Sequence, residues 1–225
     1  ALASANRGNL VAHGLAPEGI ENNEVLYELV TDAGWSDRHI DVREWLRQYS
    51  VNRYGAAPEL LMKSWDGLLK SVYGSFTDHP RFNWQFRPGN VKNGSVNMNA
   101  DYFRGLEDFI AASDQLKESP YYRNDLREMT AHYLGAKAEI LTKMIDQEYL
   151  LGDTLRARSL QCRFEKLMLG IDRLLAQHPT LRLDRWVAFA TNAARTEAQR
   201  KQYETNARRI VTIWGPPVDD YAARI

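Results

Sequence analysis

Disulfide frameworks, strong net charge and long apolar runs are all missing from this sequence of 225 residues. A single cysteine, Cys162, excludes an internal disulfide. Lys plus Arg and Asp plus Glu each number 29, so no overall electrostatic field draws the chain to nucleic acid. No apolar run approaches the roughly 20 residues that span a bilayer. We therefore predict neither a nucleic-acid partner nor a membrane partner.

Motifs for metals and cofactors are missing as well. No Gly-rich phosphate loop, Ser nucleophile elbow or Rossmann fingerprint is present. Cys162 lies in the apolar-periodic run from Leu160 to Met168, which predicts a buried small side chain rather than a reactive thiol. The histidines share no spacing with cysteine or carboxylates that would build a metal site; they are His13, His39, His79, His132 and His178. We predict no metal and no cofactor.

What the sequence does contain is helical periodicity with marked helix ends. Asp41 with Glu44, and Thr196 with Gln199, are capping boxes, and Gly55 is typical of a helix C-terminus. The two longest predicted helices should form an antiparallel pair. The predicted helices lie between Asn22 and Gly34, Asp41 and Gly55, Pro58 and Gly74, Asp101 and Ala112, Tyr121 and Leu151, Asp153 and Gln177, around Trp186, and from Thr196 to Ile213.

The helical pattern fails between Ser75 and Asn99, where Gly, Asn and Pro interrupt the chain. Four aromatic residues lie among them: Phe76, Phe82, Trp84 and Phe86. These aromatics favour a long loop that is ordered and packed. The sequence leaves open whether the loop is a lid over a site or a packed insertion.

The beginning of the chain differs from the rest. Residues 9–12 are a short apolar run that fits a buried strand, although a lone strand must pair with something outside this chain or is not a strand. The segment 14–20 follows directly and leads into a helix. A strand, a tight loop and a helix form the unit of a (β/α)8 barrel, whose catalytic groups project from the C-terminal strand ends. Glu18, between Pro17 and Gly19, would lie at such an end; from spacing alone, a surface turn is the simpler interpretation.

Two segments resemble a known family. Residues 14–29 (GLAPEGIENNEVLYEL), with Gly34-Trp35 closing the helix, are similar to the segment that carries the second catalytic carboxylate in glycoside hydrolase family 89, the α-N-acetylglucosaminidases. Near the other end, Tyr203, Asn206, the run 211–216 (VTIWGP) and the triplet 220–222 (DYA) resemble that family's second signature, in its C-terminal helical domain. The helices expected between the two segments agree with the family's architecture.

The resemblance implies a retaining exo-hydrolase that removes terminal α-linked N-acetylglucosamine from glycans. Such enzymes use two carboxyl groups about 5 to 5.5 Å apart, one as nucleophile and one as acid and base. Glu18 matches the nucleophile, whereas the acid/base partner lies on an earlier barrel strand, upstream of residue 1. The implied partners are this upstream barrel of the same polypeptide and a glycan with terminal α-linked N-acetylglucosamine. The resemblance also implies an exported parent protein, whether periplasmic, extracellular or lysosomal, and the chain alone is expected to be inactive.

Four further residues could line a sugar site, each with an alternative role. Trp214 could stack on a sugar ring or end a core stripe, and His13 could line the site or make a structural hydrogen bond. Tyr221 and Asn206 could bind a sugar hydroxyl, or could pack and cap a helix. The acids that might replace the missing partner are more simply caps or solvated charges; they are Asp101, Asp108, Asp219 and Asp220.

These observations predict a mainly α fold. Residues 1–35 would be the strand, catalytic loop and helix that end a (β/α)8 barrel, and residues 36–225 would form an all-α C-terminal domain that is truncated at its end. The predicted function is that of part of a glycoside hydrolase, with Glu18 as its nucleophile. The alternative is a noncatalytic helical module for carbohydrate binding or protein interaction, in which Glu18 is an incidental turn residue.

Overall fold

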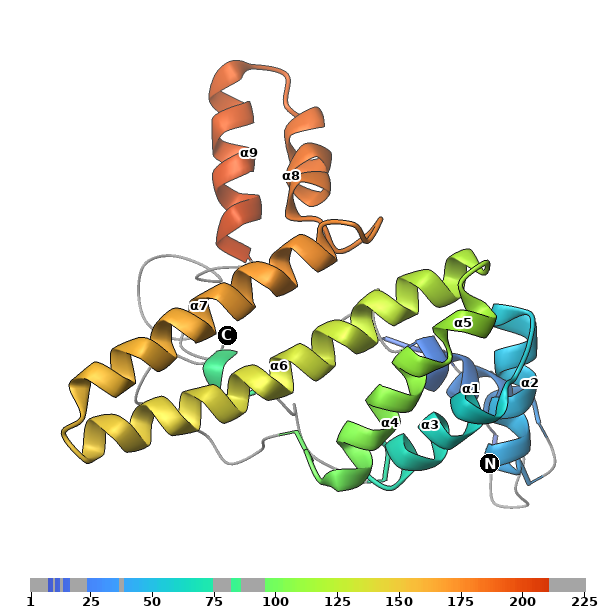
Figure 1. Cartoon of the computed structure of the whole chain (residues 1–225). Coiled ribbons are helices and arrows are strands. Elements are labelled where there is room, and N and C mark those ends of the chain that lie inside the picture. The colour runs from blue at the N-terminus through green and yellow to red at the C-terminus, as the bar shows by residue number, and fades with distance from the viewer. Residues whose placement is uncertain are drawn as a thin grey trace.

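The computed structural model describes residues 8–9, 11–12, 14–16, 24–36, 39–74, 82–85 and 96–210 (Figure 1). These residues form nine α-helices and one short 3-10 turn, without any strand, which confirms the prediction of a mainly α fold. The elements are α1 (Glu24–Trp35), α2 (Val42–Tyr54), α3 (Glu59–Leu69), η1 (Asn83–Gln85), α4 (Ala100–Ala111), α5 (Ser113–Leu116), α6 (Pro120–Leu150), α7 (Thr154–Leu175), α8 (Leu183–Asn192) and α9 (Glu197–Ile210).

The strand predicted near the N-terminus is not observed among the described residues. Asn9, Val11 and Ala12 adopt no strand, and Val11 is 98% exposed rather than buried; Leu10 lies outside the described residues. A single extended segment has no neighbour for its backbone hydrogen bonds. Of the expected strand, loop and helix at the end of a barrel, the described part of the chain therefore shows the helix, α1, and not the strand.

Helix ends follow the predicted caps at α2 and α9. The Asp41 carboxylate accepts two backbone N–H bonds of 3.0 Å at the start of α2. Gly55 ends that helix with φ of 92°, in the left-handed region that favours glycine. Thr196 accepts a backbone N–H bond of 3.2 Å at the start of α9. Gly34 is an exception, because α1 continues through it to Trp35.

The main hydrophobic core lies among α2, α3, α4 and the first half of α6. Trp65, Phe109 and Tyr122 are at most 1% exposed. The rings of Phe109 and Tyr122 stack with centroids 5.1 Å apart, and Trp65 meets Phe109 edge to face at 5.9 Å. Trp65 Nε1 donates a 3.0 Å hydrogen bond to the buried Ser50 hydroxyl, so the buried indole N–H is satisfied. Val25 of α1 also belongs to this core.

Two glycines allow α3 and α4 to approach closely. A Cβ atom added at Gly67 would lie 2.8 Å from the Asp101 carbonyl oxygen, and one added at Gly105 would lie 3.0 Å from the Ser64 carbonyl oxygen. Backbone atoms at these distances cannot move aside as a flexible side chain can. The crossing of α3 and α4 therefore requires glycine at both positions.

The long helices α6 and α7 form the predicted antiparallel pair (Figure 1). Gly152, with φ of 80°, makes the turn between them, and Asp153 caps α7. The prediction that Cys162 is buried was wrong, because its side chain is exposed. Leu160 is buried in α7, and helix positions two apart point to different faces.

The described part of the aromatic loop is packed against α6. Phe82 is 5% exposed and stacks on Trp84 with ring centroids 5.6 Å apart. Trp84 Nε1 donates to the Gly135 carbonyl at 2.9 Å, and Asn83 donates from its backbone and side chain to the completely buried Glu139 at 2.7 and 2.6 Å. The prediction of an ordered, packed loop is confirmed for residues 82–85. The other two aromatics lie outside the described residues: Phe76 and Phe86.

Candidate functional site

Helix α1, which follows the Glu18 loop in the sequence, is tied to α2 at both ends. Trp45, near the start of α2, donates a 2.8 Å hydrogen bond from Nε1 to the Asp32 carboxylate near the end of α1. Arg53, near the end of α2, pairs with Glu24 at the start of α1, with 3.9 Å between Nη2 and Oε1. Because the contacts join opposite ends, the two helices run antiparallel. The start of α1 is thereby placed beside the end of α2.

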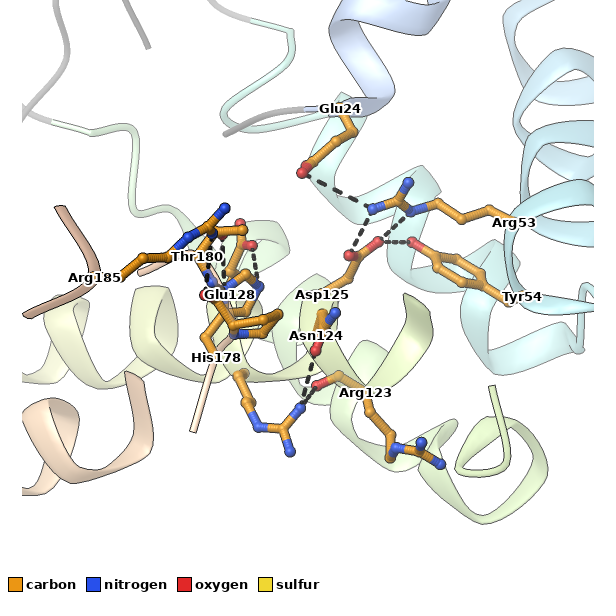
Figure 2. Close-up of polar contacts among 12 residues, drawn as sticks. Glu24, Arg53, Tyr54, Arg123, Asn124, Asp125, Glu128, His178, Thr180 and Arg185 are labelled. Atoms are coloured by element: carbon orange, nitrogen blue, oxygen red, sulfur yellow. Dashed lines mark hydrogen bonds and ion pairs between the residues drawn. The ribbon is translucent and has the colours of Figure 1, made fainter. Parts of the chain in front are cut away.

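The polar group at this place, called here the Arg53–Asp125 cluster, consists of Glu24, Glu28, Arg53, Tyr54 and Asp125. Figure 2 shows all of these residues except Glu28. Arg53 donates from Nε and Nη2 to the two oxygens of Asp125, at 2.7 and 2.9 Å. The Tyr54 hydroxyl donates a 2.7 Å bond to the same carboxylate. Arg53 Nη1 lies 3.9 Å from Glu28 Oε1. One guanidinium thus joins α1, α2 and α6.

Burial and charge within the Arg53–Asp125 cluster shift several pKa values. Desolvation lowers the pKa of Arg53, but the hydrogen bond and the charge of Asp125 together outweigh it and raise that pKa. Desolvation and the nearby Asp125 carboxylate raise the pKa of Tyr54 well above its ordinary value. Partial burial raises the pKa of Glu28, which the charge of Arg53 lowers only in part. At neutral pH Arg53 is therefore charged and Tyr54 is a neutral donor.

Neither Arg53 nor Asp125 was predicted as a site residue, although the sequence carries a signal for Asp125. Asp125 follows the buried Tyr122 by three positions and precedes Met129 by four, so it occupies the apolar face of α6. A charged residue on such a face is rarely buried without a partner. The sequence could therefore have indicated a buried ion pair, but not the identity of its partner.

A second polar group on α6 lies one helical turn further along (Figure 2). His178 Nε2, in the turn after α7, lies 3.0 Å from Glu128 Oε1. The Thr180 backbone N–H donates to His178 Nδ1 at 3.2 Å, so Nε2 carries the proton that faces the carboxylate. Arg185 donates to the Pro179 carbonyl at 3.1 Å. The His178–Glu128 contact attaches the turn between α7 and α8 to α6, and the other two bonds hold the turn itself.

Most of the residues predicted to line a sugar site lie outside the described residues: Glu18, His13, Trp214 and Tyr221. Asn206 is described, and its side chain is exposed on α9. It lines a shallow depression formed by one face of that helix. Because only Asn206 of these residues is described, the roles of all five stay predictions.

Two of the four acids considered as substitutes for the catalytic acid/base, Asp101 and Asp108, are described, and both lie in helix α4. Asp101 lies in the first turn of α4, where a negative charge is favourable, and Arg104 Nη1 lies 3.7 Å from it. Asp108 lies in α4, whereas Asp219 and Asp220 lie outside the described residues. Within the described ranges, no group of three His, Cys, Asp or Glu residues is arranged to hold a metal ion. None of the described helices is long and apolar enough to cross a membrane.

A curated human relative, alpha-N-acetylglucosaminidase, is 31% identical to this chain over 224 residues. The match includes 95% of this chain and 30% of the relative. The chain thus spans less than a third of the length of that protein.

Solved structures of a family 89 glycoside hydrolase from Clostridium perfringens have the same fold. The complex with PUGNAc superposes with a TM-score of 0.81, at 22% identity, over 92% of this chain and 26% of that one. A second structure of the Clostridium enzyme, with two glutamates replaced by glutamine and its substrate GlcNAc-alpha-1,4-galactose bound, gives the same TM-score, identity and coverage.

A family model covers most of this chain. Residues 45–225 match the model described as the alpha-N-acetylglucosaminidase (NAGLU) C-terminal domain. This range contains the helical core, the α6 and α7 pair and the hairpin of α8 and α9. The chain therefore belongs to the family of α-N-acetylglucosaminidase C-terminal domains.

Proposed function

We propose that this chain is the nucleophile-bearing C-terminal part of a retaining exo-hydrolase that removes terminal α-linked N-acetylglucosamine from glycans. Glu18 is the nucleophile, and the acid/base carboxyl group lies in the upstream part of the same polypeptide. Residues 1–35 belong to the catalytic barrel of that polypeptide, and residues 36–225 form its helical domain. Export of the parent enzyme, which the family resemblance implies, is part of the same proposal.

The proposed reaction has two steps at the anomeric carbon. In the first step a Glu18 carboxylate oxygen attacks that carbon, the bond to the leaving oxygen breaks, and the upstream acid gives that oxygen its proton. In the second step the upstream carboxylate takes a proton from water, whose oxygen displaces Glu18 and restores both groups. Without the upstream acid the leaving oxygen departs unprotonated, so this stretch of chain by itself is expected to be inactive.

The observation that carries the proposal is the long match to the human relative around Glu18. The unmatched 5% of this chain is shorter than the stretch that precedes Glu18, so the matched region includes it. The Clostridium perfringens structure with bound substrate and two replaced glutamates is consistent with chemistry that depends on two carboxyl groups. His13, Asn206, Trp214 and Tyr221 are proposed to line the sugar site.

The test is Glu18→Ala in the full-length parent enzyme, assayed on an aryl α-N-acetylglucosaminide with and without azide. We expect loss of activity by about three orders of magnitude or more, because covalent catalysis needs the carboxylate. Azide should restore turnover by attacking the anomeric carbon from the face that Glu18 occupied, which gives the β-glycosyl azide.

The matched control is Glu44→Ala, which removes a carboxylate that is 71% exposed. It should keep the activity of the unchanged enzyme. Full activity of the Glu18→Ala enzyme would contradict the proposal and favour the alternative, in which the Pro-Glu-Gly loop is a structural turn. Loss of activity without azide rescue would argue against Glu18 as the nucleophile.

A further inference from the structure

Helix α1 buries little apolar surface. Val25, near its start, is its one buried residue and belongs to the core, whereas Leu26 is 40% and Trp35 is 87% exposed. With so little apolar burial, polar contacts with α2 add to Val25 in holding the helix. At the end that follows the Glu18 loop, these contacts are the two ion pairs with Arg53.

Arg53 itself is held firmly. Its fork of two hydrogen bonds to Asp125 fixes the plane of the guanidinium, and the bond from Tyr54 fixes the carboxylate. Asp125 and Tyr54 are 7% and 5% exposed, and both belong to core helices. The guanidinium therefore has a defined place relative to the core. Figure 2 shows it between Asp125 and Glu24, so its remaining N–H groups are directed at α1.

The charges also require Arg53 at this place. Glu24, Glu28 and Asp125 bring three carboxylates to a single guanidinium. Without the cation, the carboxylates of α1 would face the buried charge of Asp125 with no compensation. Repulsion would then move the start of α1 away from α2. Arg53 thus connects the start of α1 to α2 and α6.

We propose that Arg53 is a positioning residue for the proposed active site: through Glu24 and Glu28 it fixes the start of α1, the helix that follows Glu18 in the sequence. Glu24 follows Glu18 by six positions. This inference rests on the proposed role of Glu18 as nucleophile. A misplacement of about 1 Å at a reacting atom can lower the rate about 100-fold. The two ion pairs are partly exposed and contribute little to stability, so their catalytic effect should exceed their effect on folding.

The first test is the double variant Glu24→Gln/Glu28→Gln in the full-length parent enzyme. It removes the link to α1 and leaves the buried bonds among Arg53, Tyr54 and Asp125 in place. We expect kcat to fall about tenfold, with KM and the thermal midpoint nearly unchanged. The matched control is Glu44→Gln/Glu59→Gln, which removes the same charge from exposed first-turn positions of α2 and α3 and should leave kcat unchanged.

The second test repeats the double variant in the Glu18→Ala enzyme, with azide as the external nucleophile. If Glu24 and Glu28 act through Glu18, they no longer affect the azide-supported rate once Glu18 is absent. An equal loss in both backgrounds would overturn the proposal, because the cluster would then act on folding or on substrate binding.

The outcomes also separate this proposal from the proposed function. If azide rescues the Glu18→Ala enzyme but Glu24→Gln/Glu28→Gln keeps its full kcat, Glu18 is the nucleophile and the positioning role is wrong. The positioning role is also wrong if kcat falls only as far as a lower thermal midpoint explains. If the Glu18→Ala enzyme stays fully active, the proposed function fails, and the positioning role fails with it.

Discussion

The helical core and the C-terminal arm of this molecule are built differently. The core comprises α2, α3, α4 and the first half of α6, and it contains the largest completely buried side chains: Trp65, Tyr122, Phe109, Leu61, Met62, Leu68 and Leu106. The arm comprises α7, α8 and α9. No residue of α9 is buried, and α8 buries only Val187 and Thr191. In Figure 1 the α8 and α9 hairpin projects beyond the end of α7.

Exposure of apolar side chains shows the same contrast. The turn between α6 and α7 carries Leu150, Leu151 and Leu155, which are 88%, 71% and 81% exposed. In the arm, Trp186 and Phe189 are covered by the Arg185 guanidinium, 5.4 Å from each ring centroid, rather than by a core. The core therefore stabilises itself by burial, whereas α7 is held by its pairing with α6, and α8 and α9 are held by their hairpin contacts. The difference indicates that local stability is lower in the C-terminal arm than in the helical core.

The most effective way to break the core is expected to be alkaline pH. Its four buried tyrosines, Tyr49, Tyr54, Tyr102 and Tyr122, all have a pKa that is raised, first of all by desolvation. A raised folded pKa stabilises the protein below the unfolded value of about 10, and this contribution is lost as pH rises. Each tyrosine should lower the free energy of unfolding by roughly 1.4 kcal/mol per pH unit above 10.

The measurement is a pH titration that follows phenolate absorbance and helical circular dichroism together. We expect the phenolates of the core to appear only as helix is lost, between about pH 11 and 13, because the four tyrosines together remove about 5.6 kcal/mol per pH unit above 10 from a stability of about 5 to 15 kcal/mol. Phenolate absorbance that reaches its full value while the helices persist would contradict the assignment of these tyrosines to a dry core.

The next largest effect compares one tryptophan from each region. Trp65→Ala should lower the free energy of unfolding by about 3 to 5 kcal/mol, because it leaves a cavity and removes the donor to Ser50. Trp186 is 41% exposed, so Trp186→Ala should cost about 1 kcal/mol. Urea unfolding of both variants gives the two values. Equal costs would mean that the arm is packed as tightly as the core.

Much of the fold could be predicted because helix ends are local. Asp41, Gly55 and Thr196 act through backbone groups within a few residues, so their roles can be read from the sequence alone. The face that a helix buries depends on its neighbours in space. Cys162 shows this: the apolar residues around it predicted burial, but α7 turns the face that carries Leu160 inward and leaves Cys162 exposed.

The site was less predictable for two physical reasons. Spacing around Glu18 is compatible with an ordinary turn, so only the family resemblance marks it as catalytic. Arg53 and Asp125 are 72 positions apart, and their pairing depends on how α2 and α6 cross. No local pattern encodes such a contact. The sequence therefore suggests the chemistry, and the fold supplies the contacts that would orient it.

The smallest expected effects on stability come from replacing one helical glycine in the core, Gly105, and one in the arm, Gly170. Gly105→Ala in the core should cost about 1 to 3 kcal/mol, because its Cβ meets the backbone of α3. Gly170 in α7 has no atom within 4 Å of an added Cβ, so Gly170→Ala should stabilise the chain by about 0.4 to 1 kcal/mol through lower entropy of the unfolded state. Urea midpoints should therefore move in opposite directions. If Gly105→Ala also stabilised the chain, the close crossing of α3 and α4 would be wrong, and the core would be looser than its burial indicates.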